Sequence, residues 1–151
     1  MTLRIDPLRH LFQVLSLAFS LLPTQAMALE AADAGSYAVI HRDGHVTDFV
    51  FRVVRTANTW NVEQRKPDGS WQNVTCERDC ILRESSWTDI ERFFPTNLLA
   101  EMKPSCMHNT AFAFCNYSLV KQPGKGGHIF IALVTPSPIP LRLKKLPNDA
   151  Q

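Results

Sequence analysis

The stretch from Trp60 to Leu82 constrains the fold more than any other part of the chain, because its residue types specify a turn. In Lys66-Pro67-Asp68-Gly69, proline presets φ at the first turn position and aspartate tolerates the second. Gly69 can then take the positive φ of a bulge position. The turn predicts a hairpin in which Lys66 faces Ser70, Arg65 faces Trp71, Val62 faces Val74 and Trp60 faces Cys76.

Side chains alternate between the two faces of a strand, so this register sorts the hairpin into a core face and a solvent face. The core face carries Trp60, Val62, Val74 and Cys76, and the solvent face carries Asn61, Glu63, Arg65 and Asn73. A second turn through Glu77-Arg78-Asp79 would place Cys80 opposite Cys76 and Leu82 opposite Val74. The stretch therefore predicts a three-stranded meander with one apolar face.

Trp71 falls on the solvent face of this hairpin, beside Arg65. An exposed tryptophan next to an arginine can be simple cation–π packing or an anchor for a binding partner. Trp71 and Arg65 are the candidate interface residues.

The N-terminus has the three parts of a secretory signal peptide. Arg4 and Arg9 precede a 12-residue, mostly apolar run over 11–22, and Ala26-Met27-Ala28 fits a cleavage site. The run is shorter than the roughly 20 residues that span a bilayer, which disfavours the alternative of a retained membrane anchor. We therefore expect residues 1–28 to be removed and residues 29–151 to form one mature domain in the periplasm or outside the cell.

Charge gives no support for a nucleic-acid or membrane-surface partner. Without residues 1–28 the chain keeps 14 basic and 13 acidic residues, a net charge of +1. Positive residues are interspersed with acids except at Arg142, Lys144 and Lys145. A nucleic-acid surface needs a basic patch or stripe. A membrane span in the mature chain is not expected either.

All four cysteines lie in the part expected to be exported, where an even number indicates disulfides. Opposed strand positions favour Cys76–Cys80, which leaves Cys106–Cys115. The alternative is a four-ligand zinc site with Cys106 and His108 as nearby ligands. The Cys-x3-Cys spacing of Cys76 and Cys80 is loose for a zinc knuckle, and export favours oxidation of the thiols. We predict two disulfides, with no metal and no cofactor.

Residues 36–41 and 45–54 predict an N-terminal hairpin around Asp43-Gly44, a two-residue turn signal. In that register Arg42 faces His45, so His41 and His45 point to different faces and make a poor metal pair. The predicted core face comprises Ala38, Ile40, Thr47, Phe49, Phe51 and Val53.

Further along, Ser86 and Asp89 resemble a capping box, and Trp87, Ile90 and Phe94 recur at helical spacing. A short helix before Pro95 is predicted, with a further helical turn or two over 96–103. These helices would cover one face or end of the sheet.

The most apolar strands are predicted over 110–120 and 128–135, as central strands joined by a glycine-rich loop over 122–127. Prolines 136, 138 and 140 precede residues 141–146, which read as an edge strand. The fold class is α+β and mostly antiparallel β: a meander sheet or small, partly open barrel of about seven strands, with one or two short helices and disulfide staples.

No catalytic motif stands out from the sequence. Cys106, His108 and Asn109 are the residue types of thiol catalysis, but Cys106 is expected to be oxidised, and acids such as Asp89 suit a helix start. We therefore expect a binding module, such as an inhibitor- or immunity-like protein, that recognises a protein or envelope component. One alternative is a hydrolase with a dispersed site, which a deep polar pocket at His108 or His128 would favour. Another is a structural protein that oligomerises through an edge strand at 141–146.

Overall fold

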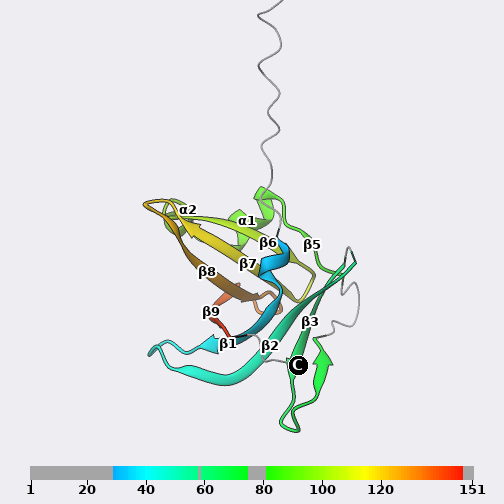
Figure 1. Ribbon diagram of the computed structural model, residues 1–151. Helices are drawn as coiled ribbons and strands as arrows, with labels where there is room; N and C mark the ends of the chain where they lie inside the picture. Colours follow the sequence, from blue (N-terminus) through cyan, green and yellow to red (C-terminus); the bar gives the residue numbers. More distant parts are fainter. Residues whose placement is uncertain (1–28, 58, 75–80, 148–151) are drawn as a thin grey trace, which may run out of the picture.

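The computed structural model describes residues 29–57, 59–74 and 81–147, in which nine strands form one antiparallel sheet (Figure 1). The strand order is β4-β3-β2-β1-β9-β8-β7-β6-β5. In chain order the elements are η1 (Ala31–Asp33), β1 (Gly35–Ile40), β2 (Val46–Thr56), β3 (Thr59–Arg65), β4 (Trp71–Asn73), β5 (Arg83–Glu84), α1 (Trp87–Phe93), α2 (Thr96–Leu99), β6 (Met102–His108), β7 (Phe112–Leu119), β8 (Gln122–Ala132) and β9 (Ile139–Lys145). The mostly antiparallel fold with two short α-helices is confirmed. The sheet is open and has nine strands, not about seven.

The sheet is strongly curled, and residues from both of its halves pack in one hydrophobic core. Neighbouring strands lie about 4.8 Å apart, so β2 and β8 would be roughly 14 Å apart in a flat sheet. The rings of Phe51 on β2 and Phe130 on β8 nevertheless have centroids 5.1 Å apart. Tyr37 on β1 and Phe114 on β7, also three strands apart, have ring centroids at 5.2 Å. The inner face of the curled sheet therefore forms the main core.

The two helices cover the other face of β6, β7 and β8. Ile90, Phe93 and Phe94 pack there against Ala113, Cys115 and Ile131. Alternate residues of β7 thus face two cores, as predicted for a central strand apolar on both faces. Figure 1 shows α1 and α2 beside these strands.

Helix α1 begins as its sequence predicts. The Ser86 hydroxyl accepts a hydrogen bond from the Asp89 amide, and the Asp89 carboxylate accepts one from the Ser86 amide at 2.9 Å. The helix ends before Pro95, also as predicted. Trp87, however, is 57% exposed and donates from Nε1 to Glu91, so it does not share the burial of Ile90 and Phe94 despite the helical spacing.

The β3–β4 hairpin has the predicted register. Arg65 pairs with Trp71, and the Lys66 amide donates to the Ser70 carbonyl at 2.8 Å. Gly69 has φ +83°, the positive value that the turn requires. Trp60 and Val62 are buried in the main core, as predicted. The predicted Trp60–Cys76 pair lies outside the described residues.

Among residues 59–74 and 81–147, no third strand of the predicted meander pairs with β4. β5, which begins just after Leu82, pairs with β6 and lies at the opposite edge of the sheet from β4. Leu82 is buried in the main core, but as part of the other end of the sheet. Because the sheet is curled, the Leu82 side chain is buried in the main core without the predicted pairing with Val74.

The loop of the β1–β2 hairpin is one residue longer than predicted. The His41 amide donates to the His45 carbonyl, and the Gly44 amide donates to the His41 carbonyl, both at 2.9 Å. Arg42, Asp43 and Gly44 therefore form a three-residue loop, with Gly44 at φ +93°. His41 lies opposite His45, and the prediction that the two histidines point to different faces is wrong.

A bulge follows in the same hairpin and changes which side chains are buried. The partner of Ala38 is Val50, whereas the partner of Ile40 is Val46. Phe51 and Val53 are buried as predicted, but Tyr37 shares their face instead of Ala38. Phe49, predicted to lie in the core, is 45% exposed.

Two segments predicted as non-strand are strands. The predicted helical turns over 96–103 end at Leu99, and β6 begins at Met102 and runs through Pro104. Pro104 is tolerated because β5 borders β6 only at Met107 and His108.

The predicted glycine-rich loop over 122–127 is the first part of β8. Its backbone packs closely against β7. A Cβ on Gly126 would lie 1.9 Å from the Tyr117 carbonyl oxygen, so the glycine permits strand contact here.

The last strand is central and not at an edge. β9 pairs with β1 on one side and β8 on the other. Pro140 lies in the part bordered by β8 alone, because the β1 pairing covers residues 142–145. Leu143 packs in the main core, which explains why this basic, proline-containing strand is held inside the sheet.

The predicted Cys106–Cys115 disulfide is confirmed. The two residues are directly opposed on β6 and β7, with Cα atoms 4.1 Å apart. The bond lies under the helices, and both cysteines are buried. Cys76 and Cys80 lie outside the described residues, so their pairing stays a prediction.

Candidate functional site

A cavity of about 590 Å³ lies between α1, the start of β5, the end of β6 and the loop that follows β8. We call it the His108 cavity. Its volume is within the range of small-molecule sites. Its lining combines charged and polar side chains (Arg83, Asp89, Arg92, His108, Asn109, Thr110 and Thr135) with the apolar side chains of Phe93, Leu133, Pro136 and Pro138.

Basic groups outnumber acidic ones in this lining. Arg92 is in the last turn of α1, where the helix dipole favours a cation. The one carboxylate, Asp89, accepts hydrogen bonds from the Ser86 amide at 2.9 Å and the Ser86 hydroxyl at 2.6 Å. These bonds lower the pKa of Asp89, with smaller contributions from His108 and Arg92. The cavity therefore suits a ligand that carries an anionic or strongly polar group.

His108 is oriented by its neighbours. Its Nδ1 lies 2.8 Å from the Ser85 hydroxyl oxygen, and the Phe93 ring packs edge-on with centroids 5.5 Å apart. Ser85 is buried and does not line the cavity. A nucleophile must reach the substrate, so this serine is poorly placed for catalysis.

The disulfide rules out two chemical alternatives for this region. Cys106 is bonded to Cys115, so it is neither a thiolate nucleophile nor a zinc ligand in this structure. His108, the other residue of both alternatives, is at the end of the same strand and lines the cavity.

The predicted interface residue Trp71 is half-buried on the short edge strand β4. The cation over its ring is Arg52, with its guanidinium carbon 4.4 Å from the ring centroid. Arg52 also pairs with Glu63. Arg65 is exposed and is the cross-strand neighbour of Trp71. Sequence analysis found the exposed face of the hairpin but missed Arg52, which comes from the preceding strand.

The other histidine considered in the sequence analysis, His128, belongs to a partly buried polar cluster outside the His108 cavity. Its Nε2 lies 2.9 Å from Asp33 Oδ1, and the Asn116 side-chain amide donates to Asp33 Oδ2 at 2.9 Å. The Glu30 amide donates to the same carboxylate at 2.8 Å. We call Asp33, Asn116 and His128 the Asp33 cluster; it joins η1 to β7 and β8.

Burial alone would raise the pKa of Asp33, but the hydrogen bonds from His128, the Glu30 amide and Asn116 outweigh it. The pKa of this carboxyl is therefore lowered. Tyr37 donates its hydroxyl to the Asp33 carbonyl at 2.6 Å and packs its ring against His128. These hydrogen bonds hold η1 against β7 and β8.

None of the helices within residues 29–57, 59–74 and 81–147 has the length and apolar character needed to cross a membrane. Comparison with protein-family models, with curated proteins and with solved structures finds no match for this chain.

Proposed function

We propose that this chain is an exported binding module of the periplasm or cell envelope, which recognises a protein or envelope component and catalyses no reaction. The observation that carries the proposal is the His108 cavity, whose lining combines two arginines and a histidine with apolar side chains. Converging polar groups over an apolar lining are typical of recognition sites. The basic excess favours a partner that inserts a carboxylate or another anionic group.

A hydrolase is the second candidate, because a polar cavity that holds His108 is the feature such an enzyme needs. The hydrogen bond between Ser85 and His108 Nδ1 is the specific observation in its favour. The burial of Ser85 away from the cavity lining weighs against it. The structural alternative, oligomerisation through residues 141–146, has less support, because β9 lies between β1 and β8 and is paired on both sides within the chain.

Charge reversal in the cavity tests the proposal. Arg92→Glu should lower capture of the partner from an envelope extract by about tenfold or more, a loss of about 1.4 kcal/mol in binding. Arg142→Glu is the matched control, because Arg142 is an exposed arginine on β9 that does not line the cavity. Quantitative pull-down with wild type and both variants measures the effect, after thermal melts confirm that each is folded.

The outcomes separate the candidate surfaces. Capture that survives Arg92→Glu but is lost in Trp71→Ala would move the binding surface to the β3–β4 hairpin. Capture that both variants retain would contradict the cavity and the hairpin alike. Turnover of a chromogenic ester that disappears in Ser85→Ala would favour the hydrolase.

Export is proposed from the leader sequence, and intact mass tests it. The protein recovered from the envelope fraction should begin at Leu29, the residue after Ala26-Met27-Ala28. Cleavage there keeps Leu29, which packs in the main core. A mass that still includes residues 1–28, in a protein that sediments with membranes, would contradict the proposal.

A further inference from the structure

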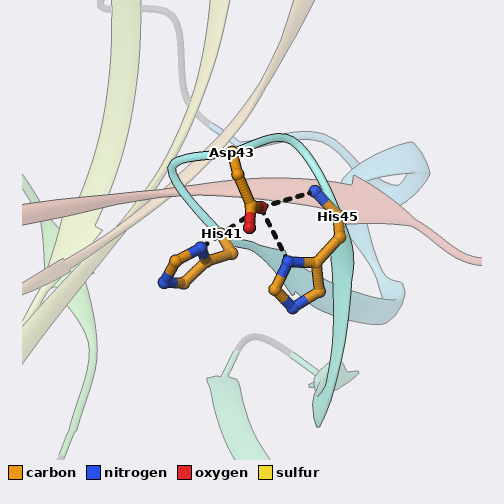
Figure 2. A group of neighbouring side chains, drawn as sticks. All are labelled: His41, Asp43 and His45. Carbon is orange, nitrogen blue, oxygen red and sulfur yellow. Dashed lines mark hydrogen bonds and ion pairs between the residues drawn. The ribbon is translucent and has the colours of Figure 1, made fainter.

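The tip of the β1–β2 hairpin brings together three side chains with metal-binding atoms. The three-residue loop places His41 directly opposite His45, and opposed residues of an antiparallel pair project from the same face. Asp43 lies between them in the loop. Figure 2 shows the two imidazole rings on either side of the Asp43 carboxylate.

The distances are those of a preassembled ligand set. Asp43 Oδ1 lies 3.2 Å from His41 Nδ1 and 2.7 Å from His45 Nδ1. One donor atom from each residue fits within 4.8 Å of the others. Ligand bonds of about 2.0–2.2 Å in a tetrahedral site put neighbouring donor atoms roughly 3.3 Å apart. Small side-chain rotations would therefore let one ion replace the present contacts with Asp43.

The local charge also suits a cation. Asp43 supplies a carboxylate, which is negatively charged at neutral pH. All three side chains are 57–61% exposed, so an ion can enter directly and keep water in its remaining positions.

We propose that His41, Asp43 and His45 form a binding site for one divalent transition-metal ion. Two imidazole nitrogens and one carboxylate oxygen suit Zn²⁺, Cu²⁺ or Ni²⁺, whereas Mg²⁺ and Ca²⁺ prefer oxygen ligands. The site is independent of the proposed function, because none of its residues lines the His108 cavity.

Calorimetric titration of the protein, prepared without a histidine tag, with ZnCl₂ tests the site. We expect one ion per chain, with Cu²⁺ bound more tightly than Zn²⁺, as the general order of these metals requires. His41→Ala and His45→Ala should each weaken Zn²⁺ binding by about tenfold or more. Arg42→Ala is the control, because it changes the same loop without removing a donor atom. A tenfold excess of Mg²⁺ over Zn²⁺ should leave Zn²⁺ binding unchanged.

Nuclear magnetic resonance locates the ion. Zn²⁺ should shift the ring signals of His41 and His45 and leave those of His108 and His128 in place. Binding that survives in the His41→Ala/His45→Ala double variant would overturn the proposal, as would the absence of binding at about 1 mM metal. The double variant should melt like wild type, since all the altered side chains are exposed.

Discussion

Replacing Asp33 with alanine is expected to lower the free energy of unfolding by about 1–3 kcal/mol, which is typical of leaving buried hydrogen-bonding groups without a partner. Asp33 is 6% exposed and accepts hydrogen bonds from His128, Asn116 and the Glu30 amide. Its removal leaves three partly buried donors without their acceptor. Urea unfolding of the variant and wild type measures the difference.

Asp48→Ala is the matched control, because Asp48 is an exposed acid on β2 and should change stability by less than about 0.5 kcal/mol. Equal unfolding midpoints for Asp33→Ala and Asp48→Ala would contradict a structural role for the Asp33 cluster.

The Asp33 carboxylate makes the free energy of unfolding depend on pH, and the direction of this dependence follows from its pKa. The pKa of Asp33 is lower in the folded chain than its ordinary value of 3.8. Its contribution is therefore complete above the unfolded pKa and is lost as pH falls through the folded one. Unfolding measured between about pH 5 and pH 2 should show a steeper acid loss for wild type than for Asp33→Ala. An equal loss of unfolding free energy in the two proteins over this pH range would contradict this assignment.

Trp60→Ala should cost about 3–5 kcal/mol of folding stability, as large-to-small changes in a core do. Trp60 is 5% exposed and belongs to the main core with Val62. A domain with a total margin of order 5–15 kcal/mol could lose its fold at ordinary temperature. Thermal and urea melts measure the change.

Trp71→Ala is the comparison on the same hairpin. It removes the contact with Arg52, a cation–π interaction worth about 0.5–1 kcal/mol at an exposed site, and little core packing. We expect it to melt close to wild type. Equal losses in the two variants would place both tryptophans in the core and contradict the observed faces of the hairpin.

Local residue chemistry predicts a hairpin where it specifies one turn. Pro67, Asp68 and Gly69 fix both the turn and the register of β3 and β4, and both are as predicted. Asp43-Gly44 is compatible with a two-residue and a three-residue loop, so the sequence does not choose between them. That difference of one residue decides whether His41 and His45 meet.

Contacts between distant segments explain the other errors. The first part of β8 resembles a loop in composition, yet Gly126 is a strand residue because the Tyr117 backbone packs against it. The basic, proline-containing β9 resembles an edge strand, and only its pairing with β1 and β8 places it at the centre.

The His108 cavity could not be predicted from local sequence patterns, because contacts between distant segments form it. Its charged side chains come from β5, α1 and β6, and the partner of His108, Ser85, is 23 residues away in sequence. The face of the hairpin on which Trp71 lies was predictable, because strand alternation alone decides it. Its stacking partner Arg52 was not, since that contact depends on the pairing of β2 with β3.

The central place of β9 has a consequence for the order of folding. In the strand order, β1–β4 and β5–β8 are joined through β9 alone. The second pairing of β1 therefore cannot form until β9 (Ile139–Lys145) has been made. Contacts of such high sequence separation slow folding, and until they form, the facing edges of β1 and β8 remain open to pairing with other chains. A nascent chain of this topology therefore presents two open strand edges until β9 has been made.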